Sequence, residues 1–176
     1  MIFVLFGPPG VGKTYMGQLI GRTLNIPFFD ADTLIDAEEH QLIQSGLYDQ
    51  NARDRFVKKL IKQVESILND AGNQDLIIAE AFTKEKNRYE FMSNFPGNVF
   101  YIIVDTPREL AKERSDNRYS LGGHVINERA FETIWGEFEP PRFLHFTMPN
   151  ADLSDDIIVE NFTHLIQLAK RRRGNL

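Results

Sequence analysis

The segment that most constrains this chain is a glycine-rich loop at residues 7–14, directly after the apolar run at 2–6. It reads Gly7-Pro8-Pro9-Gly10-Val11-Gly12-Lys13-Thr14 and matches the pattern G-x-x-x-x-G-K-[ST]. In such loops backbone N–H groups surround phosphate oxygens, the lysine places a charge on the β- and γ-phosphates, and the hydroxyl faces Mg²⁺. A tight strand-to-helix turn would need neither Lys13 nor Thr14. The sequence therefore predicts a nucleotide site that uses ATP and Mg²⁺.

The length and charge of the chain narrow the class of nucleotide-binding protein. Its 176 residues suit a single domain over 1–176 and leave no room for the extra helical domain of a ring ATPase. No Asn-Lys-x-Asp guanine reader occurs, which disfavours a GTPase. The formal net charge of -5 disfavours nucleic acid as a partner. With no Cys and no apolar run long enough for a membrane span, we expect a cytoplasmic small-molecule kinase, monomeric or homodimeric.

Short apolar runs alternate with longer segments of helical spacing, and this alternation predicts an α/β domain. The expected strands cover residues 2–6, 27–29, 76–79, 99–104 and 143–146. Helices are expected over 15–24, around 56–67, from Pro107 to about Asn117, and over 155–172.

Carboxylates follow the second and third apolar runs, where a doubly wound sheet places its ligands. Asp30 and Asp32 lie two residues apart, so strand alternation would put them on one side. In phosphoryl transfer one such carboxylate anchors Mg²⁺, and the other orients and deprotonates the attacking hydroxyl. The alternative for Asp32 is a helix N-cap near Thr33. Glu80 and Asp105 both end strands and both could assist the metal; we favour Glu80.

Two arginines, Arg114 and Arg118, are spaced to share one face of the helix that follows Pro107. The glycine-bearing segment after them, residues 119–124, suits a lid over the triphosphate, and the two guanidiniums would stabilise charge during transfer. His124 within that segment is a candidate substrate or phosphate contact, although a lone loop histidine is more often simply exposed.

Together these motifs resemble the small-metabolite kinases of the phosphate-loop superfamily, specifically the gluconokinase branch with shikimate kinase as a cousin. Four segments carry the resemblance over most of the chain: Gly7–Thr14, Phe29–Asp32, Gly46–Arg55, and Arg114 to Arg118 with Gly123-His124 and Phe138-Glu139-Pro140. The resemblance implies a three-layer fold with a parallel five-stranded sheet in the order 2-3-1-4-5, helices on both faces and a short lid at about 118–127.

The resemblance also implies roles for single residues. Asp30 would serve magnesium and Asp32 the acceptor hydroxyl, while Arg55 and Arg88 would hold the carboxylate or polar groups of the acceptor. The adenine would lie between Arg114 and the loop after the fifth strand, residues 147–152. The third strand would then lie beside the first, which supports Glu80 over Asp105 near the phosphates.

The chain departs from the family pattern after the third strand. It reads Ala79-Glu80-Ala81-Phe82-Thr83-Lys84, where gluconokinases have a Ser-Ala-Leu-Lys-like stretch and shikimate kinases a triple glycine. The lid is also longer, with four residues between Arg118 and Gly123. A carboxylate at position 80 would repel a sugar acid. A neutral polyol, a nucleoside-like acceptor or a polynucleotide 5′-hydroxyl is then easier to accommodate, and a regulatory or toxin-like ATP-binding module stays an alternative.

Overall fold

The strand that precedes the glycine-rich loop, β1 (Ile2–Phe6), lies in the middle of a parallel sheet. The structure is a computed structural model, which describes residues 1–70, 74–121, 126–151 and 153–174. The sheet has five strands in the order β2-β3-β1-β4-β5. The other strands are β2 (Phe28–Asp30), β3 (Leu76–Glu80), β4 (Val99–Asp105) and β5 (Phe146–Pro149).

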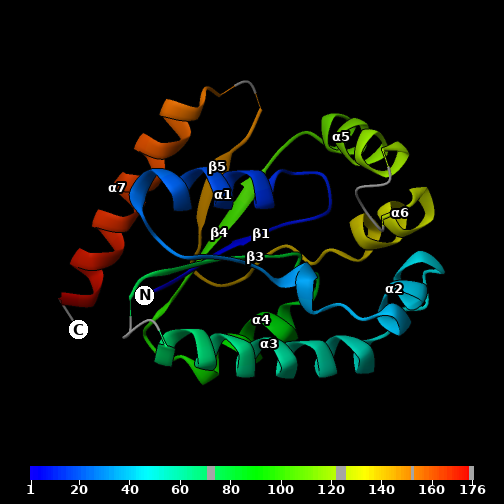
Figure 1. The fold of residues 1–176 in the computed structure, drawn as a ribbon, viewed down its shortest axis with the longest axis horizontal. Helices are drawn as coiled ribbons and strands as arrows, with labels where there is room; N and C mark the ends of the chain where they lie inside the picture. The colour runs from blue at the N-terminus through cyan, green and yellow to red at the C-terminus, as the bar shows by residue number, and fades with distance from the viewer. Residues whose placement is uncertain (71–73, 122–125, 152, 175–176) are drawn as a thin grey trace.

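Every residue of β1 is buried, because helices cover both faces of the sheet. Phe3 and Leu5 pack on the side of α1 (Lys13–Leu24) and α7 (Asp155–Gly174). The alternate residues of β1 pack against α3 (Gln50–Asp70) and α4 (Glu85–Asn94). Figure 1 shows these two helical layers on opposite sides of the strands. The predicted three-layer fold and strand order are confirmed.

The remaining helices gather beyond the carboxyl ends of the strands (Figure 1). They are the short 3₁₀ helix η1 (Ala31–Leu34), α2 (Ala37–Gln44), α5 (Arg108–Ser120) and α6 (Glu128–Glu137). Helix α6 is tied to α2 by the Asn127 amide, which donates to the carbonyl of Gln44, and to α5 by an Arg108–Glu132 ion pair. Among the described residues, no helix combines the length and apolar character that crossing a membrane requires.

The last strand and the lid differ from the sequence prediction. The strand expected at residues 143–146 is wrong in position, since β5 begins only at Phe146. Phe143 instead packs against the rings of Phe6 and Tyr101, with ring centres 6.4 and 4.9 Å away. Helix α5 continues through Ser120, so the first residues of the predicted lid are helical, and residues 122–125 of that lid lie outside the described residues.

Candidate active site

The glycine-rich loop joins β1 to α1 and forms a narrow backbone cradle. Gly10 and Gly12 have φ angles of 82° and 99°, in the left-handed region that favours glycine. A Cβ at Gly10 would lie 2.0 Å from the carbonyl oxygen of Ala111, and one at Gly12 would lie 2.0 Å from Asn150 Nδ2. Only glycine fits at either position, and the cradle therefore suits phosphate oxygens bound by backbone N–H groups.

Three separate elements hold this loop in place. The carbonyl of Val11 accepts from Thr106 Oγ1 at 3.0 Å and from Asn150 Nδ2 at 2.7 Å. The indole of Trp135, on α6, donates to the carbonyl of Pro9 at 3.2 Å. Sequence reasoning missed Thr106 and Trp135, and no local pattern marks them, because their partners are more than 90 residues away in the chain. Asn150 lies in the loop that was predicted only as part of an adenine site.

A small cavity opens directly on the loop, and we call it the loop cavity. Its lining residues are Gly10, Gly12, Lys13, Thr14, Asp30, Asp32, Ala79 and Arg118. The sequence predicted six of these eight residues as nucleotide, catalytic or metal contacts, either in the motif or at a strand end. It also predicted that Arg118 closes over the phosphates. The structure thus brings the predicted donor-side residues to one place.

The two aspartates reach the loop cavity by a different route from the predicted one. Asp30 ends β2, and its carboxylate accepts a hydrogen bond from the backbone N–H of Asp32 at 3.1 Å. Asp32 therefore belongs to η1 rather than to a strand, and strand alternation does not explain its direction. The helical turn brings both carboxylates to the same cavity nonetheless.

The donor set of the loop cavity fits a hard divalent cation bound together with phosphates. Within the described residues, no group of three or more His, Cys, Asp or Glu side chains could hold a metal ion alone. Mg²⁺ commonly uses one or two carboxylates and completes its shell with phosphate oxygens and water. The Thr14 hydroxyl and the Asp30 carboxylate are hard oxygen ligands of this kind.

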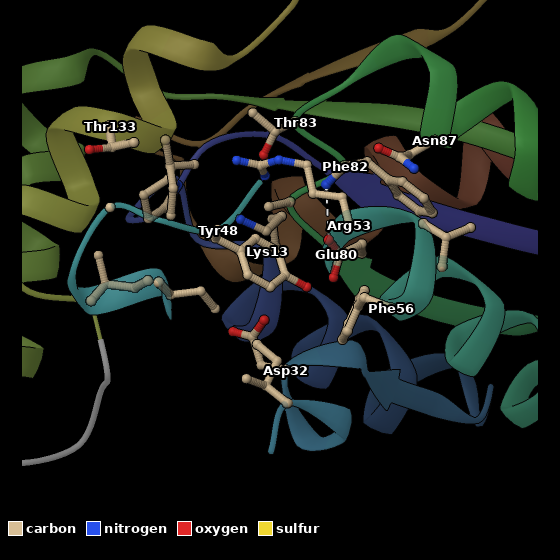
Figure 2. Close-up of a pocket in the computed structure, with 18 residues that line it drawn as sticks. Lys13, Asp32, Tyr48, Arg53, Phe56, Glu80, Phe82, Thr83, Asn87 and Thr133 are labelled. Carbon is tan, nitrogen blue, oxygen red and sulfur yellow. Dashed lines mark hydrogen bonds between the residues drawn. The ribbon is translucent and has the colours of Figure 1, made fainter. Parts of the chain in front are cut away.

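A second cavity, which we call the Glu80 cavity, lies beyond Lys13 and Asp32. It has a volume of about 100 Å³. Figure 2 shows Lys13, Asp32 and Glu80 around this space, with the rings of Tyr48, Phe56 and Phe82 beside them. The other lining residues are Pro9, Ile35, Ile43, Gly46, Arg53, Val57, Ala81, Thr83, Asn87, Ile126, Thr133 and Ile134.

A third cavity, the Asn150 cavity, opens on the other side of the loop and has a volume of about 510 Å³. Arg114 lies in its wall and donates from Nη1 to the carbonyl of Asn150 at 3.1 Å. The adenine site predicted between Arg114 and residues 147–152 falls on this cavity and stays a prediction, and Asp152 itself lies outside the described residues. Further lining residues are Gly10, Gly12, Tyr15, Asn117, Arg118, Leu153 and Ile158.

The charged groups at the centre perturb one another. Burial lowers the pKa of the Lys13 ammonium, against the opposing effect of Asp32 and Glu80. Its Nζ donates to the carbonyls of Gly7 and Pro8, both at 2.8 Å. Asp32 is an exposed residue of η1, and partial loss of hydration at its carboxylate together with the charge of Asp30 raises its pKa.

Glu80 is a second carboxylate whose pKa is raised at this site. Burial, reinforced by the charge of Asp32, raises the pKa of Glu80 to about 7. The N–H of Phe82 donates to its Oε1 at 3.1 Å and fixes the carboxyl group (Figure 2). Asp105, the other candidate, is exposed at the end of β4 and lies outside the three cavities. Glu80 lines the Glu80 cavity and not the loop cavity, so its support of the metal stays a prediction.

Two predicted acceptor contacts, Arg55 and Arg88, do not line the Glu80 cavity. Arg55 is exposed on α3, while Arg53, two residues earlier, lines the cavity. Arg88 is fully buried beside β3 and β4 and does not reach the cavity. His124 lies outside the described residues. Sequence reasoning did not single out Arg53, Tyr48 or Asn87, since nothing in a helical or loop segment shows which side chain turns inward.

Arg88 acts as an internal clamp between segments that border the Glu80 cavity. Its Nε donates to the carbonyl of Phe82 at 2.7 Å, and Nη2 donates to the carbonyls of Thr83 at 3.1 Å and Glu139 at 2.5 Å. The guanidinium carbon lies 5.2 and 5.0 Å from the ring centres of Phe6 and Phe138. Arg88 thus ties the end of β3 to the segment after α6.

Arg88→Met is expected to lower the free energy of unfolding by about 3 kcal/mol or more, because three carbonyls lose a charged donor, and the contacts to two of them, Phe82 and Thr83, are buried. Urea unfolding measures the loss, and Arg142→Met, at an exposed arginine, is the control with little change. The acceptor KM of the folded fraction should stay near wild type. A raised KM with unchanged stability would instead support the substrate contact that the resemblance implies.

With the geometry in place, the chain can be compared with known proteins. A family profile described as AAA domain matches residues 2–141, from β1 past the end of α6. The chain belongs to this AAA domain family. The match includes the glycine-rich loop, η1 and all the described residues of the Glu80 cavity.

Relatives of this AAA domain chain carry kinase names. It is 25% identical to a probable gluconokinase of Dictyostelium discoideum, over 94% of this chain and 86% of the relative. It is 23% identical to the shikimate kinase of Vibrio vulnificus, over 93% and 94%. A solved gluconokinase from Sinorhizobium meliloti shares the fold, with a TM-score of 0.76 at 20% identity and coverage of 99% and 95%. The predicted likeness to gluconokinases and shikimate kinases is confirmed.

Proposed function

We propose that the protein is an ATP- and Mg²⁺-dependent kinase that transfers the γ-phosphoryl group to a hydroxyl of a small metabolite. The observation that carries the proposal is the succession of three adjoining cavities. The Asn150 cavity and the loop cavity share Gly10, Gly12 and Arg118. The loop cavity and the Glu80 cavity share Lys13 and Asp32. The adenine base of ATP, its phosphate chain and the acceptor would thus occupy the three cavities in that order.

The donor half of the site would position phosphates and neutralise their charge. ATP, when bound, supplies the phosphoryl group, and magnesium held by Thr14 and Asp30 offsets phosphate charge. The loop backbone and Lys13 would hold the phosphate oxygens. The Nζ of Lys13 lies over the loop, where it donates to the carbonyls of Gly7 and Pro8. Arg118, at the boundary between two cavities, would stabilise the charge that builds up during transfer.

The acceptor half would use Asp32 as general base. Asp32 lies where the loop cavity meets the Glu80 cavity, so its carboxylate can accept the proton of an acceptor hydroxyl as the oxygen bonds to phosphorus. Its raised pKa makes it a stronger base than an ordinary carboxylate. The apolar walls of the Glu80 cavity would exclude water, which otherwise competes with the acceptor.

Kinase relatives of two acceptor types support this reaction class without naming the acceptor. Gluconokinases and shikimate kinases are ATP-dependent phosphotransferases, and the chain is an enzyme of this kind. Gluconate and shikimate differ in shape, so similarity to both kinds of kinase does not identify the acceptor. Its identity has to be inferred from the residues of the Glu80 cavity.

The test is ADP formation from ATP and Mg²⁺ with a panel of sugar acids, polyols, shikimate, nucleosides and 5′-hydroxyl oligonucleotides. We expect one small acceptor to accelerate ADP formation by at least about 10²-fold over the hydrolysis seen without acceptor, the lower range for a positioned general base. Mass spectrometry of the product then identifies the phosphate ester. Acceleration by oligonucleotides alone would contradict a small-metabolite kinase.

A further inference from the structure

The charges around the Glu80 cavity limit what its occupant can be. Two carboxylates, Asp32 and Glu80, and two cations, Lys13 and Arg53, lie among its described lining residues. Lys13 serves the phosphate loop, where it donates to two carbonyls. Arg53 forms an ion pair with Glu137 on α6. Among the described lining residues, each cation is therefore engaged before an occupant arrives.

Three cations near the cavity but outside its lining, Arg55, Lys86 and Arg88, are exposed or already donate to other groups. Arg55 is exposed, and Arg88 donates from Nε and Nη2 to backbone carbonyls, while its buried Nη1 has no hydrogen-bond partner and lies outside the cavity lining. Lys86 pairs with Asp54 at 2.6 Å, and this hydrogen bond contributes most to lowering the pKa of Asp54 to about 2. An occupant with a carboxylate would face two carboxylates, and the charge of the lining arginine, Arg53, is already balanced by Glu137.

The polar groups that remain at the cavity suit hydroxyls. Asn87 is almost fully buried, and its Nδ2 donates to Asp54 Oδ1 at 2.9 Å while its Oδ1 accepts from Gln50 Nε2 at 3.0 Å. A carboxylate can only accept, so Asp54 fixes the nitrogen side of Asn87 and leaves a second N–H on Nδ2 for a ligand. The N–H of Phe82 donates to Oε1 of Glu80, so Oε2 is the oxygen that would accept a hydrogen bond from a ligand hydroxyl.

The rest of the wall is apolar and partly aromatic. The rings of Tyr48, Phe56 and Phe82 and several Ile and Val side chains line the cavity, as Figure 2 shows for the three rings. Burial raises the pKa of Tyr48, which therefore keeps its hydroxyl proton as a donor. Apolar walls with a few fixed polar groups are typical of sites for compact, uncharged ligands.

Resting on the proposed kinase function, we infer that the acceptor is an uncharged hydroxyl compound with an apolar or aromatic face. It is held by hydrogen bonds to Glu80 and Asn87, without an arginine–carboxylate pair. Sugar acids and cyclic hydroxy acids are accordingly poor ligands of this cavity. Glu80 repels them by charge, and Glu137 already balances the charge of Arg53.

The test uses matched pairs that differ mainly in charge: gluconate and glucitol, shikimate and its methyl ester, and 4-(hydroxymethyl)benzoate and its methyl ester. Calorimetry with a non-hydrolysable ATP analogue and Mg²⁺ measures binding at pH 8.5, above the pKa of about 7 for Glu80. We expect the neutral member of each pair that binds to be favoured on the order of tenfold to a hundredfold, the effect of a like charge at short range in a partly shielded site.

Two variants change the charge balance from different sides. Glu80→Gln removes the repelling carboxylate, and Glu137→Gln removes the partner of Arg53; each should reduce the neutral-over-anionic preference by roughly tenfold, about one such charge contact. Glu65→Gln, at an exposed position of α3, is the matched control and should leave the preference unchanged. If one variant fails to fold, the other still carries the comparison.

The possible results separate this inference from the kinase proposal. A binding preference for the neutral compounds that both soluble variants reduce supports the inferred acceptor class. If ADP formation is absent at the same time, only the kinase proposal fails. Tighter binding of the anionic members overturns the inference, even if they are phosphorylated. Binding of no compound from any pair also overturns it, and so does a preference that neither Glu80→Gln nor Glu137→Gln alters.

Discussion

Lys13→Ala is expected to lower kcat by at least ~10²–10³-fold, the loss typical when one preorganised charge or donor is removed from a transition state. Lys13 lines both the loop cavity and the Glu80 cavity, so its ammonium lies between the proposed phosphate chain and the acceptor. Steady-state ADP release measures kcat, and calorimetry with an ATP analogue measures the accompanying loss of nucleotide affinity.

The fold should tolerate this substitution. Burial lowers the pKa of Lys13, which means that the ammonium is costly to keep dehydrated, and its two hydrogen bonds to loop carbonyls offset part of that cost. We therefore expect the thermal midpoint to change by only a few degrees. Lys58→Ala, at an exposed position of α3, is the matched control and should keep full activity. Full phosphoryl transfer by Lys13→Ala would refute the site.

Much of the fold could be predicted from the sequence because runs of apolar side chains mark the buried segments. The run Ile2–Phe6 has no polar residue, as a strand covered on both faces requires, and the glycine-rich loop then fixes the strand-to-helix connection. Residues 143–146 are less informative, since Phe143 is as apolar as a strand residue but packs into a cluster of aromatic rings outside the sheet. Apolar character predicts burial, and it does not distinguish a strand from a packed loop.

Some residues of the candidate site could be predicted from the sequence, and others could not. The loop residues and Arg118 could be predicted because their roles depend on local spacing or on a strand end. Arg55 could not be distinguished from Arg53, because residues two apart point to different sides of a helix and the sequence does not show which side meets the cavity. Trp135 and Asn150 hold the loop through partners more than 120 residues away, a relation that only the folded chain shows.

Asp32→Asn is expected to lower kcat by ~10²–10⁴-fold, the contribution typical of a positioned general base. The amide keeps the shape of the side chain but cannot take the proton of the acceptor hydroxyl. Nucleotide affinity should change little, since the loop backbone, Lys13 and Arg114 are untouched. Single-turnover kinetics with saturating ATP isolates the transfer step, and Asp70→Asn, an exposed carboxylate of α3, is the control with wild-type rates.

The pH dependence distinguishes a base from a merely structural carboxylate. Burial and the charge of Asp30 raise the pKa of Asp32, so the base form is lost as pH falls, and at a higher pH than for an ordinary aspartate. Wild-type kcat should decline on this acid side. Asp32→Asn should remove the decline, whereas Glu80→Gln should keep it, although Glu80 itself titrates near pH 7. The opposite pattern would assign the base to Glu80. Because Asp32 lies at the junction of two cavities and Glu80 lines only one, the geometry favours Asp32 as the proton acceptor.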